Sequence, residues 1–252
     1  YTLKKENELL MARRTEELKL AGELQKAILR PTVQTTDGIE IRTTSRPAKG
    51  LYCSGDYYDV IVLGPERYLF LIGDVEGPEI RSALVTAIMK SVIYPEYVRN
   101  FRDKAFSPSE FLAWLNDRLH FEFRGMNQIL VTFFAGLMDL REHTFTYSNA
   151  GHTHPYLYRA GIIEELPKSG SPLGFAQKTL YPETSLSIKQ NDFLLLYTIG
   201  LSGQNIEMRK REILGKVPVG DEFHQRLMAA LLSESEESEF TGDFTILTAL
   251  VL

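Results

Sequence analysis

The order of apolar and polar residues begins with one long helical segment. Residues 1–29 are rich in Glu, Lys, Arg, Leu and Ala, which favours a helix. Leu3 and Leu10 lie one heptad apart, and so do Met11 and Leu18, although the register slips by one residue between the two pairs. Two structures fit this pattern equally well: an amphipathic helix packed on its own domain, or a short coiled coil that dimerises and transmits a signal.

The rest of the chain alternates between strand-like and helix-like segments. Strands are predicted around residues 39–41 and over residues 57–63, 68–72, 130–140, 144–148, 156–158, 162–166, 186–188, 193–198 and 244–252. Helices are predicted over residues 79–94, with Pro95 ending or kinking the helix, from the Ser107 cap onward, and over residues 206–214 and 222–232. The acidic run 233–239 is predicted to be a solvated loop.

The grouping of these elements predicts the fold class. Strands come in blocks with helices between them, which indicates an α+β fold of antiparallel sheets flanked by helices rather than a series of βαβ units. Pro31 ends the first helix, and no further boundary is visible after it. We therefore expect two parts: residues 1–30 as an N-terminal helix or linker, and residues 31–252 as one globular domain.

The composition limits which partners and which cellular compartment are expected for this chain. The 252 residues carry a formal net charge of −5, which gives no reason to expect nucleic acid as a partner. Cys53 is the single cysteine, so no intrachain disulfide can form and a reducing cytoplasm fits best. No apolar run has the length needed to span a bilayer. Because the chain opens on Tyr1, we expect it to be cut from a longer protein whose upstream sensor region, membrane-anchored or not, lies outside it.

Two carboxylates beside glycines are the candidate chemistry. Asp56 and Asp74 each lie at the end of an apolar strand-like run. Two carboxylates brought close together repel each other unless a proton or a cation intervenes, and such oxygen ligands suit Mg²⁺ or Mn²⁺. Spacing alone does not distinguish this site from ordinary Asp-Gly turn chemistry.

A longer series of motifs resembles one family. In order, the chain carries Gly55-Asp56-Tyr57-Tyr58-Asp59, Gly73-Asp74-Val75, Ser107-Pro108, Asn149-Ala150-Gly151-His152, Ser171-Pro172-Leu173-Gly174 and Asp192-Phe193-Leu194-Leu195-Leu196-Tyr197-Thr198. This series, from about residue 23 to residue 252, resembles the bacterial metal-dependent protein phosphatases (PPM family) of the RsbU/SpoIIE type. Residues 23–31 are similar to the regulatory helix that precedes these domains.

The resemblance implies a β-sandwich between pairs of helices, with two Mg²⁺ or Mn²⁺ ions at one edge. These ions activate the water that attacks a phosphoserine or phosphothreonine, and the substrate is typically a small anti-sigma-factor antagonist in a partner-switching pathway. By motif, Asp74 would bridge both ions, and Asp56 with the backbone carbonyl of Val75 would complete one site. The other site normally takes two further aspartates, but Ile199 and Gly242 stand at those positions.

These departures predict an impaired metal centre, with at most one tightly bound ion. Asp243, Asp59 and Glu76 are the candidate replacement ligands. Asp243 neighbours a lost ligand, so strand alternation would turn it away unless a bulge at Gly242 redirects it. Asp59 fits a structural role as well, and Glu76 fits loop drift. His152 is interpreted as a structural support of a strand end.

Two functions follow. The first is an active, weak serine/threonine phosphatase acting on an antagonist protein, with metal at Asp56, Asp74, Val75 and Asp243. The second is a pseudophosphatase, a regulatory module that keeps the fold and binds a protein partner without turnover. In either case we expect a homodimer formed through the N-terminal helix.

Overall fold

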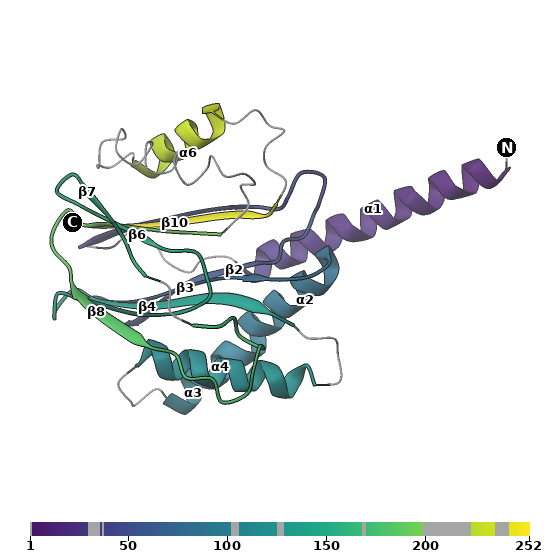
Figure 1. Ribbon diagram of the computed structural model, residues 1–252. Coiled ribbons are helices and arrows are strands. Elements are labelled where there is room, and N and C mark those ends of the chain that lie inside the picture. The colour runs from purple at the N-terminus through teal and green to yellow at the C-terminus, as the bar shows by residue number, and fades with distance from the viewer. Residues whose placement is uncertain are drawn as a thin grey trace.

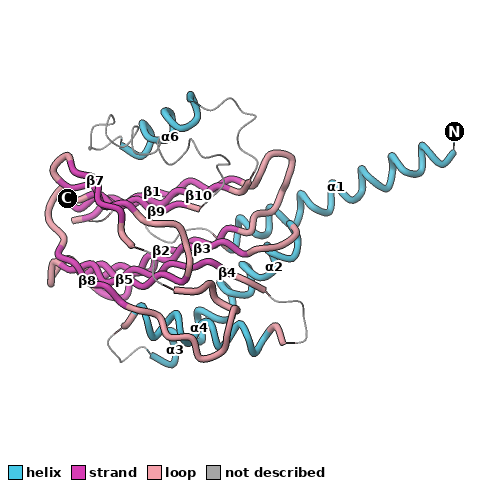
Figure 2. Tube along the Cα trace, in the orientation of Figure 1, coloured by secondary structure: helices cyan, strands magenta, loops and turns pink. Residues whose placement is uncertain are grey.

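The computed structural model describes residues 2–29, 36, 38–101, 106–124, 129–167, 170–198, 223–234 and 242–252. Within these residues, two antiparallel sheets pack face to face, and helices cover both outer faces (Figures 1 and 2). The predicted α+β sandwich flanked by helices is therefore confirmed. The helix predicted over residues 206–214 lies outside the described residues, as does most of the acidic run 233–239.

The first sheet is built from neighbouring hairpins. Its order is β2-β3-β4-β5-β8, with β2 Asp56–Gly64, β3 Arg67–Val75, β4 Val131–Asp139, β5 Thr144–Ala150 and β8 Glu183–Ser187. The predicted hairpins of β2 with β3 and of β4 with β5 are confirmed.

The second sheet joins distant parts of the chain. Its order is β1-β10-β9-β6-β7, with β1 Ile39–Arg46, β10 Phe244–Val251, β9 Phe193–Tyr197, β6 Tyr156–Arg159 and β7 Ile162–Glu165. Strand β1 pairs with β10 along its whole length, from Ile39 opposite Val251 to Arg46 opposite Phe244. The strand latest in the chain therefore lies between the earliest strand and β9.

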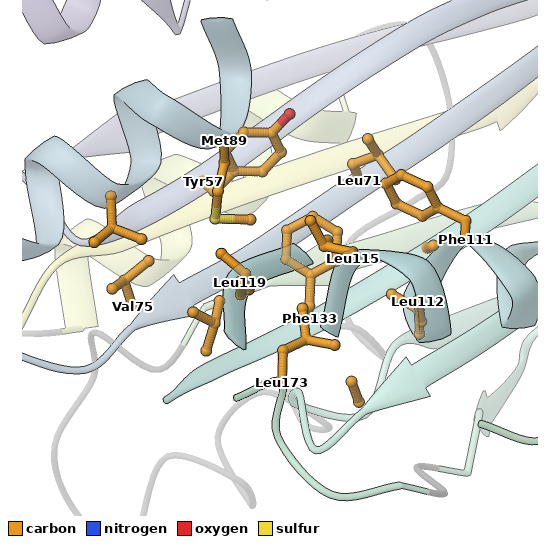
Figure 3. Close-up of a cluster of buried hydrophobic side chains, with 14 of the residues drawn as sticks. Tyr57, Leu71, Val75, Met89, Phe111, Leu112, Leu115, Leu119, Phe133 and Leu173 are labelled. Atoms are coloured by element: carbon orange, nitrogen blue, oxygen red, sulfur yellow. The ribbon is translucent and has the colours of Figure 1, made fainter. Parts of the chain in front are cut away.

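Apolar side chains form three layers, as expected when two sheets are covered on both sides. One cluster lies between the first sheet and helices α2 Glu79–Ile88, α3 Tyr94–Phe101 and α4 Pro108–Glu122, and it includes Tyr57, Phe111 and Phe133 (Figure 3). A second cluster fills the space between the sheets. A third joins the second sheet to helix α6 Phe223–Glu234.

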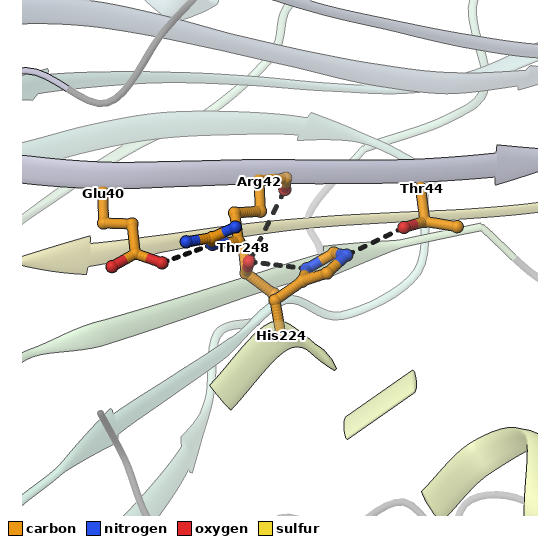
Figure 4. A network of polar contacts seen from close by, with 5 residues as sticks. All are labelled: Glu40, Arg42, Thr44, His224 and Thr248. Atoms are coloured by element: carbon orange, nitrogen blue, oxygen red, sulfur yellow. Dashed lines mark hydrogen bonds and ion pairs between the residues drawn. The ribbon is translucent and has the colours of Figure 1, made fainter. Parts of the chain in front are cut away.

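Helix α6 also has a polar attachment to the sheet below it. The His224 ring reaches Thr44 Oγ1 of β1 through Nε2 and Thr248 Oγ1 of β10 through Nδ1, at 2.8 Å in both cases (Figure 4). His224 is buried, and burial, with the nearby positive charge of Arg42, lowers its pKa to about 4. The imidazole is therefore held neutral between two threonine hydroxyls.

The helix predicted to end or kink at Pro95 continues past it. A five-residue π-helical turn, Met89–Ile93, follows α2, and α3 begins at Tyr94. Pro95 then occupies the first turn of α3, where a residue without an N–H group costs nothing. The irregularity is the π turn before the proline, which sequence periodicity did not reveal.

Helix α1 Thr2–Ile28 has two parts with different surroundings. Near its C-terminal end Gly22 and Gln25 are buried against the domain. Leu29, just after the helix, belongs to the cluster between the first sheet and helices α2, α3 and α4. Toward the N-terminus the helix extends away from the body, and Leu9 and Met11 are exposed (Figure 1). The C-terminal part is thus packed on its own domain, whereas the coiled coil stays a prediction. Among the described residues, no helix is both long and apolar enough to cross a membrane.

Candidate functional site

Asp56 and Asp74 lie directly opposite each other at one end of the first sheet. Asp56 opens β2, Asp74 comes next to last in β3, and the two residues are register partners. Opposed residues of antiparallel strands have Cα atoms about 4.5–5.5 Å apart and side chains on the same face. Val60, in the same alternation as Asp56, belongs to the cluster between the sheets, so both carboxylates lie on the inner face of the sandwich.

The second sheet reaches Asp56 through two threonines. Asp56 Oδ2 accepts hydrogen bonds from Thr198 Oγ1, just after β9, and from Thr245 Oγ1 of β10, at 2.7 Å in both cases. Thr198 Oγ1 also accepts the Thr245 backbone N–H, which ties the two strands together. Sequence reasoning missed this role of Thr198 and Thr245, although Thr198 ends a motif that it had singled out.

The environment of Asp56 disfavours the ionised form of its carboxyl group. Its side chain is almost fully buried, and Oδ1 has no hydrogen-bond partner. Burial raises the pKa of this carboxyl to about 8, the two threonine hydrogen bonds oppose that rise, and the charges of Asp74 and Asp243 add to it. A buried, unpartnered carboxylate oxygen beside other acids is a place where a cation would relieve both desolvation and repulsion.

Asp74 shares this environment at the edge of the site. It is half-buried, and burial raises its pKa to about 6, with further contributions from the charges of Asp243 and Glu76. A Cβ on Gly55 would lie 2.8 Å from the Val75 carbonyl oxygen and 3.3 Å from Asp74 Oδ1. Glycine at position 55 therefore lets the β2 entry approach the predicted metal ligands closely.

The structure describes only one of the two positions where the resemblance implies a missing aspartate. Gly242 lies just before β10 and supplies no side chain, while Ile199 lies outside the described residues. Asp243 is directed toward the loop before β2: its Oδ1 accepts the Ala48 N–H at 2.8 Å, and its Oδ2 accepts the Gly55 N–H at 2.6 Å. Asp243 is therefore near the other two aspartates, but both of its oxygens already bind backbone amides.

Asp59 does not belong to this cluster. It follows Asp56 by three positions, so it faces the helices rather than the sandwich interior. Its Oδ2 forms an ion pair with Lys90 Nζ of the π turn, and both side chains are largely buried. Of its two predicted roles, the structural one is supported and the metal-ligand one is not.

His152 is buried and hydrogen-bonded within the fold, as expected for a structural role. It is buried, its backbone N–H donates to Asn149 Oδ1 at 2.7 Å, and its Nδ1 lies 3.0 Å from Thr132 Oγ1. Burial lowers its pKa to about 3, so the ring is neutral. Because Thr132 pairs with Asp74 across the sheet, His152 supports the strand next to the site.

The donors present suit a hard cation but are few. Asp56, Asp74 and the Val75 carbonyl offer only oxygen, the donor that Mg²⁺ and Mn²⁺ prefer. In the part of the chain that the structure describes, no group of three or more His, Cys, Asp or Glu side chains is arranged to hold an ion. These donors fit a divalent cation but make up only part of the coordination shell that such an ion takes.

Comparisons with known proteins agree with this fold. Residues 64–251 match the family described as Stage II sporulation protein E (SpoIIE). The phosphoserine phosphatase RsbU of Bacillus subtilis (strain 168) is 27% identical over 188 residues, which span 74% of this chain and 53% of RsbU. The chain thus spans about half the length of this curated relative.

Solved structures show the same architecture. The SiaA-PP2C domain of Pseudomonas aeruginosa is similar with a TM-score of 0.80 at 16% identity, over 96% of this chain and 98% of that domain. RsbX, solved in complex with magnesium, is similar with a TM-score of 0.66 at 13% identity, over 88% of this chain and 99% of RsbX. At these identities the likeness speaks for the fold alone.

Proposed function

Because this chain belongs to the SpoIIE family of PP2C-type phosphatase domains, we propose that it is a serine/threonine protein phosphatase of the RsbU/SpoIIE type with an impaired metal site. The observation that carries the proposal is the pairing of Asp56 with Asp74, with Asp56 Oδ1 buried and unpartnered. Asp59 Oδ1 is also buried and unpartnered, but the charge of Asp59 is balanced by Lys90. The charges that act on Asp56 and Asp74 are those of other acids, which is the situation that a cation relieves.

The proposal assigns ligands to this chain's own residues. Asp56, Asp74 and the Val75 carbonyl would hold one Mg²⁺ or Mn²⁺ ion, and Asp243 would be an additional ligand of the same cluster. When bound, such an ion supplies charge neutralisation for a phosphoryl group and lowers the pKa of a water. Thr198 and Thr245 hold Asp56 in place from the opposite sheet.

The proposed substrate is a phosphorylated anti-sigma-factor antagonist protein. RsbU is a phosphoserine phosphatase, and the family assignment supports a phosphorylated regulatory protein as the partner. We assign the catalytic domain to residues 31–252, the signalling helix to residues 1–30, and the domain as a whole to the cytoplasm. The sensor that supplies the input is proposed to lie outside this chain.

A pseudophosphatase is the second candidate, and two observations favour it. Gly242 supplies no ligand, and both oxygens of Asp243 are taken by backbone N–H groups. A second ion would therefore meet few protein oxygens and little compensating charge. In this case the domain would bind its partner protein without turnover.

Turnover with excess Mn²⁺ separates the two candidates. The unmodified chain is expected to hydrolyse a phosphoserine protein slowly or not at all. The double variant Ile199→Asp with Gly242→Asp restores two carboxylates, so its turnover should rise by at least about tenfold. The matched control is Ile199→Asn with Gly242→Asn, which adds similar side chains without charge and should stay near the original rate.

Two results decide between the candidates. Robust turnover by the unmodified chain that is lost in Asp243→Ala, while the melting temperature is kept, would exclude the pseudophosphatase. No gain in the double variant, in protein shown to be folded, would argue against a vacated half-site. Calorimetric titration with Mn²⁺ should give at most one tight site in the unmodified chain, and two resolved sites would contradict the impaired centre.

A further inference from the structure

The loop that leads into β2 is held by side chains from three distant parts of the chain: helix α1, helix α2 and the residue before β10. Five consecutive backbone N–H groups, those of residues 52–56, each donate to a side-chain oxygen. The acceptors are Glu79 Oε1 for Tyr52 at 2.7 Å and Cys53 at 3.1 Å, Gln25 Oε1 for Ser54 at 2.9 Å, Asp243 Oδ2 for Gly55 at 2.6 Å, and Ser54 Oγ for Asp56 at 3.0 Å. We call these side chains the amide clamp.

Two members of the amide clamp are carboxylates. Glu79, in the first turn of α2, takes the first two amides with one oxygen. Asp243 takes the Gly55 amide with one oxygen and the Ala48 amide with the other, so it joins both ends of the loop. Hydrogen bonds from backbone N–H groups to a charged oxygen are stronger than those to neutral acceptors.

The neutral member Gln25 holds the loop from helix α1. Besides accepting the Ser54 N–H, Gln25 donates through Nε2 to the Ser54 carbonyl at 2.6 Å and to Thr86 Oγ1 at 2.9 Å. Cys53, Ser54, Gly55 and Asp56 are all buried. Leaving any of these buried amides without an acceptor would carry a full desolvation cost.

The clamp has a consequence for how Asp56 reaches its position. We propose that Glu79 and Asp243 are positioning residues that fix residues 52–56 without a divalent cation, so that the loop and Asp56 keep their places in the metal-free protein. Four of the five amides donate to side chains from outside the loop, those of Gln25, Glu79 and Asp243. The proposal makes the loop a fixed part of the fold rather than a segment that a bound ion orders.

Hydrogen exchange on the metal-free protein tests this directly. In excess EDTA, the amides of Tyr52, Cys53 and Gly55 should be protected in the unmodified chain. Glu79→Ala should raise exchange at Tyr52 and Cys53 by about tenfold or more, because both amides lose a charged acceptor. Glu79→Gln keeps an oxygen at the same place and should restore part of the protection.

A matched control is available at the other end of the sheet. Glu142, an exposed residue of the β4–β5 turn, lies beyond Asp139, at the opposite end of β4 from the residue paired with Asp74. Glu142→Ala should leave the exchange of residues 52–55 unchanged. A general loss of stability would raise exchange throughout the core strands, so an increase confined to residues 52–53 is what the clamp requires.

The single cysteine provides a second readout. Cys53 is buried within the clamped loop, so its rate of modification by a thiol reagent reports opening of that loop. In EDTA, labelling should be slow in the unmodified chain and faster in Glu79→Ala, and added Mn²⁺ should not slow it further in the unmodified chain. Because neither readout uses substrate, a failure of the proposed phosphatase function leaves this result unaffected.

Two exchange results would contradict the proposal. If the amides of Tyr52, Cys53 and Gly55 exchange freely in EDTA and become protected only when Mn²⁺ or Mg²⁺ is added, the cation organises the loop and the proposal is wrong. If protection in EDTA survives Glu79→Ala unchanged, the Glu79 carboxylate has no positioning role.

Discussion

Single acidic residues in this chain differ in function according to what surrounds their oxygens. Asp56 keeps one buried oxygen without a partner, whereas Asp243 places both of its oxygens on backbone amides. Asp59, close to Asp56 in sequence, is neutralised by Lys90 on the other face of the strand. Asp56 and Asp74 thus lie beside other acids, whereas Asp59 and Asp243 are bound by a lysine and by backbone amides.

Gly22 shows how much one atom matters where α1 meets the domain. A Cβ at this position would lie 2.1 Å from the Tyr52 carbonyl oxygen, a backbone atom that cannot rotate away. Gly22→Ala should therefore force α1 from its seat and lower the free energy of unfolding by about 1–3 kcal/mol. Urea denaturation of the purified domain measures this change.

The control for Gly22 is another glycine of the same chain. Gly64, at the end of β2, has nothing within 4 Å of the place where a Cβ would stand. Gly64→Ala should leave the unfolding free energy almost unchanged. Equal stability of the two alanine variants would mean that α1 does not pack tightly against Tyr52.

The placement of the aspartates could be predicted only in part from the sequence. Motif order correctly brought Asp56 and Asp74 together, and simple strand alternation would have separated Asp59 from Asp56. The position of Asp243 could not be derived in this way, because it depends on where the amides of Ala48 and Gly55 lie in a loop from the other end of the chain. Contacts of that range follow from the folded structure and not from local spacing.

Among the elements, periodicity predicted strands and helices well and their junctions poorly. The two hairpins, α4 with its Ser107 cap, and the final strand are found where predicted. The π turn was missed because a single turn of this kind has no marker residue of its own in the sequence. That turn carries Lys90, the ion-pair partner of Asp59.

Helix α6 offers a test of pH dependence. The pKa of His224, at about 4, lies below the value of about 6.5 expected in the unfolded chain. The unfolded chain therefore binds the proton more readily between these values, so the contribution of His224 to stability is complete above pH 6.5 and is lost as the pH falls toward 4. The expected loss is roughly 1–3 kcal/mol.

A comparison of two proteins isolates this effect. His224→Gln keeps a side chain that can hydrogen-bond to Thr44 and Thr248 but does not titrate. Between pH 7 and pH 4.5, the unmodified chain should lose more unfolding free energy than the variant, while His152 contributes equally to both. Identical pH profiles for the two proteins would show that His224 does not link α6 to the sheet in this way.

For the whole molecule, the order of motifs identified the architecture before any contact was known. The sandwich and the helices on both of its outer faces follow from blocks of alternating residues and from the resemblance to the phosphatase family. What the sequence left open was the role of α1, because an amphipathic stripe fits a domain surface and a second helix equally. The structure shows the first arrangement near Gly22 and Gln25, and it leaves the N-terminal half of the helix exposed.

That exposed half leads to a prediction about assembly. Leu9, Leu10 and Met11 are 72%, 59% and 64% exposed on a helix segment that extends from the body. A helix segment of this kind is marginal in water without a packing partner. We expect two copies to pair through residues 1–29, giving a dimer mass by light scattering that shifts toward the monomer in Leu10→Glu. The control Glu8→Gln should keep the dimer, and a monomer at high concentration in the unmodified chain would refute the pairing.

The pairing of β1 with β10 has a consequence for how the protein is made. On the ribosome, β2 to β5 can form from neighbouring segments as they emerge, but β1 has to wait roughly two hundred residues for the strand beside it. Until β10 is synthesised, β1 and β9 lack their common neighbour, and Thr245 is not there to hold Asp56. The site is therefore among the last features of the domain to be completed, and a nascent chain interrupted before residue 244 would expose the inner face of its first sheet.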